Sequence, residues 1–374
     1  MNTPCFVLDS DALKANYRAF SAALSAHFAS AVLAYSVKTN ANPSLLRLLC
    51  AEGAAAEVVS ATEYRLAKGI GFRKLIYNGP VKEKESFLSA IREGAIVNID
   101  SKRELGWLAE LPAKGKYGVG IRVNVSLEED ETFSRFGFDG FELDGAIAYI
   151  GSLPNIEIKG IHLHRTSKSR SLDVYRSICS RASEIIRKYG LQPEYIDIGG
   201  GFYGDFPGKP GYEDYALVLE EGLGDYKGAT VIVEPGNALC ASAFSFVSSV
   251  VDVKTVGDER VVVCDGSRND VDPFFRKSDY FKSFPGVEEG RPSSGRQTVV
   301  GFTCLENDRL FVLEDGPELH EGDRIEFSNT GAYTMALSPL FIRYFPRVYV
   351  KEGDQYRLAS DEWGADDYLK AYGL

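Results

Sequence analysis

The first two thirds of the chain alternate between short apolar segments and longer stretches with helical periodicity. In each short segment successive positions are hydrophobic, which is typical of parallel strands buried on both faces. An intervening stretch such as residues 172–189 repeats apolar residues at helical spacing, and Gly190 follows it as a typical helix end. The eight expected strands are residues 32–38, 54–60, 74–80, 95–100, 117–125, 156–164, 194–201 and 230–236.

Eight strand and helix units in succession predict an α/β protein built on a (β/α)8 barrel, the TIM-barrel fold. The alternative is a doubly wound sheet, but such sheets usually have about five or six strands. We therefore expect a barrel domain over residues 29–238.

The pattern changes after this region. Segments such as "RVVVCDGS", "DRLFVLEDG" and "DRIEFSNTG" are strand-like, but Gly, Asp and Asn turn residues separate them instead of helices. They predict a C-terminal all-β domain over residues 239–374. Residues 1–28 contain the strand-like "TPCFVLD" followed by a capped helical stretch. Because eight barrel strands are already accounted for, we expect residues 1–28 to pack with the β domain.

Charge and cysteine content exclude several classes of protein. The 374-residue chain has a net charge of -11, which argues against nucleic acid or an anionic membrane as partner. Its six cysteines are too sparse for a disulfide scaffold and show no zinc-binding spacing, so no metal is expected. Neither a signal peptide nor a membrane-spanning run is visible in the sequence. A cytoplasmic protein with reduced thiols is the expectation.

Polar residues gather at the predicted carboxyl ends of the barrel strands, where the chemistry of such barrels takes place. Together they supply an amine, a glycine-rich loop, a histidine and several acids. That combination suits pyridoxal 5'-phosphate. The strand ends carry Lys38, Glu57, Asn78, Asp100, Arg122, His164, Gly199, Gly200, Gly201 and Glu234.

Each requirement of this cofactor has a candidate residue. Its aldehyde needs a lysine amine for a Schiff base, and Lys38 ends the apolar run in "LAYSVKTNAN". Its phosphate needs approachable backbone N–H groups, which residues 199–201 offer. Its pyridine nitrogen needs an acid, and Glu234 ends an apolar strand. Each of these residues, taken singly, has another explanation. Lys38 could be an ordinary surface lysine, the glycines could form a tight turn, and His162 or His164 could be a histidine of the core.

Seven motifs in order give the chain a family resemblance. They are "YSVKTN", "GIHLHRTS", "IDIGGGF", "VEPGN", "CDGSRNDVDPFF", "GFTCLENDRL" and "GAYT". With them the chain resembles the fold-type III pyridoxal-phosphate decarboxylases, the group of diaminopimelate, ornithine and arginine decarboxylases. The resemblance covers essentially the whole chain and implies the alanine racemase-like combination of barrel and β domain.

The resemblance also implies roles for individual residues. Lys38 would hold the cofactor by a Schiff base, His164 would stack on its ring, and Glu234 would pair with its pyridine nitrogen. Cys304, contributed by the second subunit of a homodimer, would return a proton to the substrate carbon after carbon dioxide leaves. The other cofactor-binding residues would be Glu57, Ser167, Gly199, Gly200, Gly201, Gly236, Asn237 and Tyr333.

Three departures from the family pattern concern the substrate. Asn237 replaces an arginine, Thr166 replaces a glycine, and Leu305 replaces an acid that binds the distal amine of the substrate. The expected substrate is an amino acid related to diaminopimelate, ornithine or lysine, or a carboxylated or acylated diamino acid. A distal carboxylate is included because arginine side chains near the predicted site would suit it. The candidate substrate contacts are Arg268, Asp308 and Arg343.

Two other functions are compatible with the same fold. An amino-acid racemase would pair the pyridine nitrogen with arginine and use a tyrosine as second base, so Glu234 and Cys304 favour a decarboxylase. A non-catalytic regulatory homologue typically lacks the lysine or the cysteine, and both Lys38 and Cys304 are present. Substrate identity, stereochemistry and pathway are not visible in the sequence.

Overall fold

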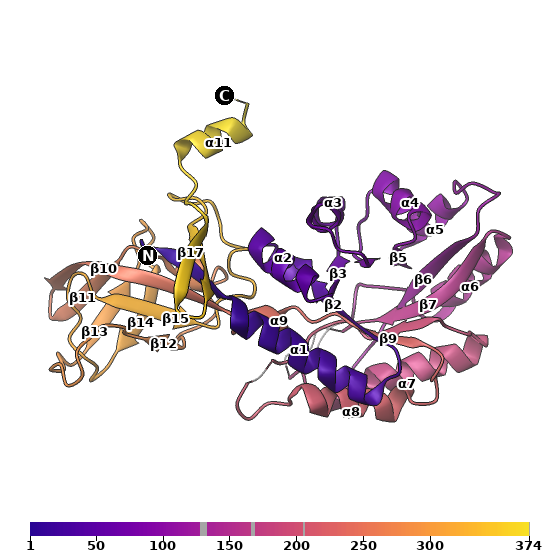
Figure 1. Cartoon of the computed structure of the whole chain (residues 1–374), viewed down its shortest axis with the longest axis horizontal. Helices are drawn as coiled ribbons and strands as arrows, with labels where there is room; N and C mark the ends of the chain where they lie inside the picture. Colours follow the sequence, from indigo (N-terminus) through magenta and orange to yellow (C-terminus); the bar gives the residue numbers. More distant parts are fainter. Residues whose placement is uncertain (128–132, 166–168, 205, 374) are drawn as a thin grey trace. The chain divides into compact units, whose positions relative to one another are not determined.

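A computed structural model describes the chain except residues 128–132, 166–168, 205 and 374. It divides into two compact units (Figure 1). The barrel unit is Lys14–Leu239, and the β unit combines Met1–Leu13 with Cys240–Leu374.

Within the described residues, eight parallel strands close into a barrel, which confirms the expected fold. Each strand pairs with the next, and the last pairs with the first through Ala31 and Val231, so no edge is left open. The strands are β2 (Ala31–Ser36), β3 (Ala55–Val58), β4 (Leu75–Tyr77), β5 (Ile96–Ile99), β6 (Tyr117–Val123), β7 (Ile156–Leu163), β8 (Tyr195–Asp197) and β9 (Thr230–Val233).

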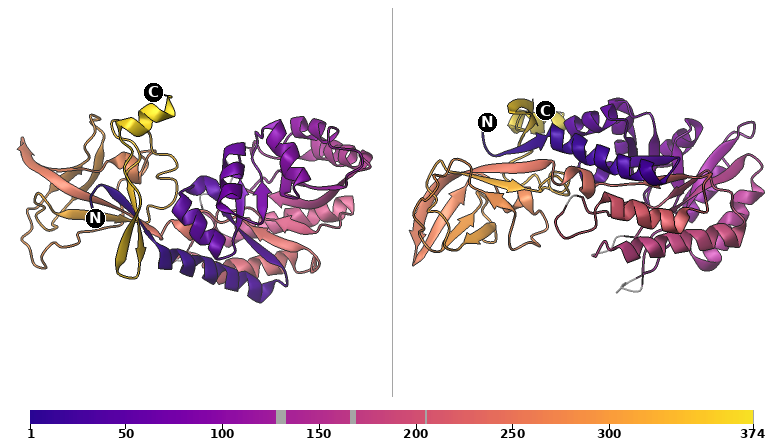
Figure 2. Two further views of the ribbon diagram at one scale, coloured as in Figure 1. Left: turned by 45° about the horizontal axis from the view of Figure 1, so that its top comes forward. Right: turned by 60° about the horizontal axis from the view of Figure 1, so that its bottom comes forward.

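Helices connect the barrel strands and lie on the outside of the barrel (Figure 2). Local capping explains their ends: Ser60 accepts a hydrogen bond from the Glu63 N–H at the start of α3, and Gly190 ends α7 in the left-handed conformation. The helices of this unit are α1 (Ser10–His27), α2 (Pro43–Ala51), α3 (Ala61–Ile70), α4 (Lys84–Arg92), α5 (Lys102–Leu108), α6 (Gly140–Ser152), α7 (Leu172–Tyr189), α8 (Tyr212–Leu223) and α9 (Asn237–Cys240).

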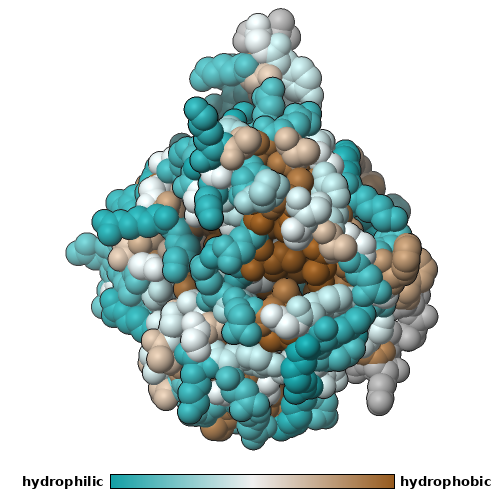
Figure 3. Space-filling model, turned by 90° about the vertical axis from the view of Figure 1, so that its right-hand side faces the viewer, coloured by the Kyte–Doolittle hydropathy of each residue, from teal (hydrophilic) through white to brown (hydrophobic). Residues whose placement is uncertain are grey.

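The amino-terminal half of the barrel interior is apolar. Ala34, Ala55, Ile76, Tyr195 and Ile232 form one buried cluster there. The face shown in Figure 3 has a hollow in which hydrophobic residues gather and which hydrophilic side chains surround. Because the apolar cluster fills the amino-terminal half, the polar part of the barrel interior lies toward the carboxyl ends of the strands.

The β unit is built on one large sheet in which the strand at the start of the chain is central. Strand β1 (Cys5–Asp9) pairs antiparallel with β10 (Phe244–Val256) and parallel with β16 (Arg347–Glu352), as expected for a β domain joined by the N-terminal strand. The other elements are β11 (Glu259–Cys264), β12 (Lys282–Ser283), β13 (Gln297–Val300), β14 (Arg309–Leu313), β15 (Arg324–Ser328), β17 (Gln355–Ser360), α10 (Arg268–Val271) and α11 (Ala365–Ala371).

Aromatic side chains form the core of this unit. The rings of Phe6 and Phe246 lie 4.9 Å apart, and Phe327 packs 6.4 Å from Phe246 on the same face of the sheet. All three side chains are fully buried. Alternation along β1 and β10 places them on one face, while Val7 and Val247 lie on the other.

The division of the chain differs from the expected one at helix α1. Residues 1–28 were expected to pack with the β domain, but the β unit takes only the first thirteen, and α1 from Lys14 onward belongs to the barrel unit. The reason is an aromatic contact: the ring of Phe20 lies 4.7 Å from Tyr212 and 5.2 Å from Phe202. Helix α1 therefore covers the barrel.

Candidate active site

Lys38 lies where strand β2 ends. The chain leaves β2 at Ser36 and enters a short 3-10 helix, η1 (Val37–Thr39). The Lys38 Nζ atom lies 2.6 Å from Glu57 Oε2 and 2.7 Å from Ser36 Oγ. Glu57, on β3, is almost completely buried, whereas the Lys38 side chain is 40% exposed. An approachable amine is thus held against a buried carboxylate.

Two further carboxyl groups, Asp197 and Glu234, meet at the ends of β8 and β9. Both are buried, and a hydrogen bond joins them. Burial raises the pKa of Glu234 well above its usual value, and the neighbouring Asp197 carboxylate raises it further. Burial also raises the pKa of Asp197 to about 7. The pair therefore holds a proton at neutral pH, and a cationic N–H group beside it would be stabilised.

An asparagine joins this acid pair to Glu57. Asn78 Nδ2, on the residue after β4, lies 2.5 Å from Glu234 Oε1 and 3.3 Å from Glu57 Oε1. Asn78 Oδ1 accepts a 2.9 Å hydrogen bond from Asn98 Nδ2. The carboxyl-terminal strand ends thus carry a continuous buried polar network.

The two histidines of β7 and its end have different surroundings. His162 is fully buried, with Nε2 3.7 Å from Glu234 Oε2. His164 is partly exposed, and its Nδ1 accepts a 3.2 Å hydrogen bond from the Gly200 N–H. Burial lowers the pKa of His164 to about 3, and the charge of Arg122 lowers it further. His162 is therefore the core histidine, and His164 is a neutral ring at the edge of the site.

The glycines after β8 and β9 leave room for neighbouring groups. Gly199 has φ +70°, and a Cβ there would lie 2.5 Å from His164 Cβ. A Cβ on Gly200 would overlap the Glu234 carbonyl oxygen, and one on Gly236 would overlap the Thr39 side chain. A side chain is thus excluded at these three positions, and backbone of this kind can present its N–H groups to a small anion.

The residues fit pyridoxal phosphate. Lys38 offers the amine that its aldehyde needs, and the Asp197 and Glu234 pair offers the buried negative charge that a protonated pyridine nitrogen needs. His164 offers a flat, neutral ring, and Gly199 to Gly201 form a backbone cradle. All of these residues converge at the carboxyl end of one barrel.

The same acids bring metal-ligand atoms together. One atom each of His162, Asp197 and Glu234 lies within 4.8 Å of the others. The carboxyl oxygens already accept hydrogen bonds, from Asn78 to Glu234 and from the Gly199 N–H to Asp197 at 2.9 Å. These oxygens are therefore already engaged by donors of the protein itself.

Two buried ion pairs lie near this network. Arg122 NH1 contacts Asp100 Oδ2 at 2.6 Å, and Lys82 Nζ contacts Glu104 Oε2 at 3.0 Å. Lys82 also donates to the carbonyl oxygen of Asn98 at 2.9 Å, so it ties the backbone of β5 to the loop after β4. Paired in this way, the charges hold the strand ends in place.

Cys304 lies in the β unit, on an exposed segment between β13 and β14. The buried Asp308 carboxylate holds this segment, because Asp308 Oδ2 accepts hydrogen bonds from Thr303 Oγ1 at 2.6 Å and from Thr303 N at 3.1 Å. Its Oδ1 accepts from the Arg268 N–H at 2.8 Å. These bonds engage the Asp308 carboxylate within the β unit, and its contact with a substrate stays a prediction.

The two arginines expected at the substrate are also in the β unit. Arg268 begins the short helix α10, and its NH2 contacts Oδ2 of Asp272, the residue after that helix, at 3.2 Å. Arg343 is exposed, donates to the Asp265 carbonyl oxygen at 2.9 Å, and lies 4.3 Å over the ring of Phe302. Arg343 is thus anchored beside the segment that carries the cysteine, whereas Arg268 is engaged by an acid.

Tyr333 is exposed and has φ +55°, a conformation that costs energy for a non-glycine residue and often marks a functional position. A Cβ on the nearby Gly331 would overlap the Cys240 carbonyl oxygen.

Two further residues were expected to bind the cofactor. Asn237 begins helix α9. Ser167, expected at the phosphate, lies outside the described residues.

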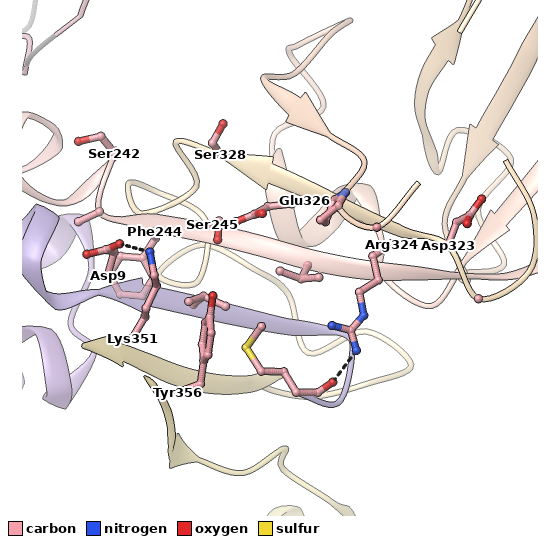
Figure 4. A pocket seen from close by; sticks show the side chains of 17 residues that line it. Asp9, Ser242, Phe244, Ser245, Asp323, Arg324, Glu326, Ser328, Lys351 and Tyr356 are labelled. Carbon is pink, nitrogen blue, oxygen red and sulfur yellow. Dashed lines mark hydrogen bonds and ion pairs between the residues drawn. The ribbon is translucent and has the colours of Figure 1, made fainter. Parts of the chain in front are cut away.

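A groove of about 830 Å³ on the β unit carries less chemistry (Figure 4). Its charged side chains include Asp9, whose carboxylate contacts Lys351 Nζ at 2.9 Å, and Arg324, which donates to the Met1 carbonyl oxygen at 3.1 Å. Among the described residues that line it there is no cysteine or histidine. We therefore place the active site at the barrel.

Sequence reasoning missed Asp197, and it placed Asn78 at a strand end without predicting its hydrogen bonds to the acids and to Asn98. Asp197 precedes the glycine run in "IDIGGG", and it shows the same signal as Glu234, an acid at the end of an apolar strand. Asn98 and Tyr195 lie inside strands, where nothing in the local pattern marks them as partners of the site.

Comparisons with known proteins agree with this geometry. The family model of the pyridoxal-binding domain of pyridoxal-dependent decarboxylases matches residues 11–241. A diaminopimelate decarboxylase from Aquifex aeolicus is 30% identical over 90% of this chain and 83% of its own length. An L-glutamyl-[BtrI acyl-carrier protein] decarboxylase from Niallia circulans is 28% identical over 98% of this chain and 93% of its own.

A solved structure shows the same fold. The diaminopimelate decarboxylase from M. jannaschii superposes with a TM-score of 0.87 at 22% identity, over 99% of this chain and 92% of its own. The family model covers more than half of the chain, and the named relatives are carboxy-lyases. The chain therefore belongs to the pyridoxal-dependent decarboxylases, the amino-acid decarboxylases of the diaminopimelate, ornithine and arginine group that use pyridoxal phosphate.

Proposed function

We propose that this protein decarboxylates an α-amino acid with the cofactor held by Lys38 and with Cys304 of a second copy as proton donor. The observation that carries the proposal is the joint placement of Lys38 against Glu57 and of Glu234 against Asp197 at one end of the barrel. These two placements offer the amine that the cofactor's aldehyde requires and the carboxylate that its ring nitrogen requires.

The bound cofactor would supply a conjugated ring that accepts the electron pair left when carbon dioxide departs. The chain's residues would do the rest. Lys38 would hold the aldehyde and release it to the substrate amine, with Glu57 accepting a hydrogen bond from the free ammonium. Glu234 would keep the ring nitrogen protonated, and the neutral ring of His164 would cover one face of the cofactor.

Cys304 would return a proton to the α-carbon. Its exposure in the β unit suits a donor that serves a second copy of the chain. A homodimer would also cover exposed apolar side chains of the same unit. These include Leu337, Leu340, Phe341, Ile342, Phe345 and Trp363, each at least 37% exposed.

The substrate is proposed to lack a free distal ammonium or to carry a distal carboxylate or acyl group. Leu305 stands beside the cysteine and has no charge, and the Asp308 carboxylate is occupied by Thr303 and the Arg268 N–H. Arg343 uses one of its five donors on the Asp265 carbonyl oxygen, so the remaining N–H groups suit a carboxylate or acyl oxygen. By its name, the relative from Niallia circulans acts on a glutamyl group attached to a carrier protein, an acylated amino acid.

Carbon dioxide release from a panel of amino acids would test this proposal. The panel contains meso-diaminopimelate, ornithine, lysine, arginine, N-acylated and carboxylated diamino acids, and a glutamyl thioester. We expect release from a carboxylated or acylated member and at most weak release from ornithine and lysine, with none from a Lys38→Ala variant. Preference for ornithine or lysine would overturn the substrate assignment. Exchange of the α-proton without release would favour a racemase instead.

A further inference from the structure

The amide of Asn78 occupies a central position among the buried acids. It is 3% exposed, and its single nitrogen contacts both Glu234, at 2.5 Å, and Glu57, at 3.3 Å. Glu57 lies on strand β3, Glu234 directly follows β9, and Asn78 directly follows β4. One side chain thus links the carboxylate beside Lys38 to the carboxylate assigned to the pyridine nitrogen.

A chain of hydrogen bonds fixes which way this amide points. The Tyr195 hydroxyl donates to Asn98 Oδ1 at 2.9 Å, which leaves Asn98 Nδ2 to donate to Asn78 Oδ1 at 2.9 Å. With its oxygen engaged in this way, Asn78 directs its NH2 group at the acids. A flipped Asn78 would place its oxygen against two carboxyl groups and its NH2 group against another NH2 group.

Two glycines leave space for Tyr195, the first donor in this series of hydrogen bonds. A Cβ on Gly160 would overlap the ring of Tyr195, and a Cβ on Gly120 would overlap both the Tyr195 hydroxyl and Asn98 Oδ1. Glycine inside a strand is unfavourable and often marks close packing. Two mid-strand glycines therefore accommodate the hydrogen bond that orients the amides.

We propose that Asn78 is a positioning residue that sets the placement of Glu57 and Glu234 together, oriented by Asn98 and Tyr195. The inference rests on the proposed function, because it assigns the two carboxylates to the cofactor. Loss of the amide removes one hydrogen bond from each of these two buried carboxyl groups, which weakens their hold on the aldehyde-bearing and nitrogen ends of the cofactor. Asn78 does not itself react.

An Asn78→Leu variant, similar in size but without hydrogen-bonding groups, tests this role through cofactor affinity. We expect the Kd for pyridoxal phosphate, measured by equilibrium dialysis, to rise about tenfold, since hydrogen bonds to charged groups are the stronger ones. Tyr195→Phe, which keeps the ring and removes only the orienting hydroxyl, should raise the Kd in the same direction by about twofold to threefold. The control is Asn124→Leu, whose amide donates to the carbonyl oxygens of Ser134 and Phe136.

A second readout needs no cofactor. The infrared band of the protonated Glu234 carboxyl group, identified by its loss in Glu234→Gln, should move to higher frequency in Asn78→Leu, because a hydrogen bond to that group is lost. Tyr195→Phe supplies both readouts if Asn78→Leu does not fold.

The possible outcomes separate the two proposals. If the wild-type protein does not attach the cofactor at Lys38, the proposed function fails and this inference fails with it. If the wild type attaches it and the Asn78 and Tyr195 variants match the wild type in Kd and in carboxyl band, the positioning role of Asn78 alone is overturned. A rise in Kd together with a shifted band, both absent from Asn124→Leu, supports it.

Discussion

The amine of Lys38 and the carboxylate of Glu57 lie 2.6 Å apart across neighbouring barrel strands. The carboxylate is buried and also accepts a 2.6 Å hydrogen bond from Ser36 Oγ, so its position is fixed from two directions. A fixed negative charge at this distance stabilises the ammonium form of lysine relative to the neutral amine. Glu57 thus fixes the position of the amine that is proposed to hold the cofactor.

Replacing Glu57 with glutamine should shift the pH dependence of cofactor attachment. Glutamine keeps an oxygen that can accept from Lys38 but removes the charge, so the neutral amine becomes populated at lower pH. We expect the midpoint of covalent attachment, followed by absorbance, to move about one pH unit toward acid. Glu93→Gln, which removes a carboxylate that contacts Lys68 and Tyr64 on the surface, is the matched control. An unchanged midpoint in Glu57→Gln would show that the contact has no such role.

Cys304 and Lys38 are expected to act in the same site from different subunits. Each single variant, Cys304→Ala or Lys38→Ala, should lose at least about a hundredfold in decarboxylation rate. Mixing the two should restore about a quarter of the wild-type rate, because half of the reassorted dimers would each contain one intact site. Cys304→Ala should still attach the cofactor.

The control for this mixture is either variant mixed with itself, which should stay inactive. If the recovered activity instead scaled with the concentration of monomeric protein, active sites shared between two subunits would be excluded. No recovery, in a mixture shown by mass labelling to have exchanged subunits, would place both residues in the same chain's site.

The pKa of His164 gives the stability of the cofactor-free protein a defined pH dependence. Its folded-state pKa of about 3 lies below the value of 6.5 for an unperturbed histidine, so the unfolded chain binds more protons between these values. Stability contributed by the neutral ring is complete above about pH 6.5 and falls as the pH drops toward 3. In denaturant titrations, wild type should therefore lose stability relative to His164→Asn on acidification.

His27 provides the control with the opposite sign. Hydrogen bonds that the His27 ring donates to Glu213 and Glu220 raise the pKa of His27, so its contribution is present below pH 6.5 and is lost as the pH rises through the raised value. Wild type should accordingly gain stability relative to His27→Asn on acidification. The same trend in both variants would contradict the assignment of His164 as a neutral ring at the edge of the site.

The buried ion pair between Lys82 and Glu104 should be essential for stability. Both side chains are fully buried, and Lys82→Met would leave an uncompensated carboxylate, at a cost of about 3 to 5 kcal/mol in the free energy of unfolding. Chemical denaturation measures this directly. Lys102→Ala, which removes an exposed partner of Glu142, should cost less than about 1 kcal/mol. Equal costs for the two variants would contradict the structural role of Lys82.

Much of the fold follows from local patterns in the sequence. The eight apolar runs indicate the barrel because parallel strands are buried on both faces, and the turn-rich segments after residue 240 indicate the β domain. Helix α1 was misplaced because its amphipathic pattern shows that one face is buried but not against what. The contact of Phe20 with Tyr212 spans nearly 200 positions of the chain, and no local signal encodes it.

The residues of the candidate site likewise fall into those that a local sequence pattern reveals and those that it does not. Lys38 and Glu234 are visible because a charged residue at the end of an apolar strand is unusual. The amides of Asn78 and Asn98 and the acid Asp197 acquire their meaning only when barrel closure brings β4, β5, β8 and β9 together. For Asp308 the sequence suggests a substrate contact, and the structure adds a hydrogen bond from Thr303 that no local pattern predicts.

The most direct test of the central claim is to reduce the cofactor-loaded protein with borohydride and map the modified residue by peptide mass spectrometry. The account predicts one pyridoxyl-phosphate adduct, on Lys38, in wild type and in Cys304→Ala, and none in Lys38→Ala. An adduct on another lysine, or an unmodified Lys38 in a protein that retains the cofactor, would contradict it.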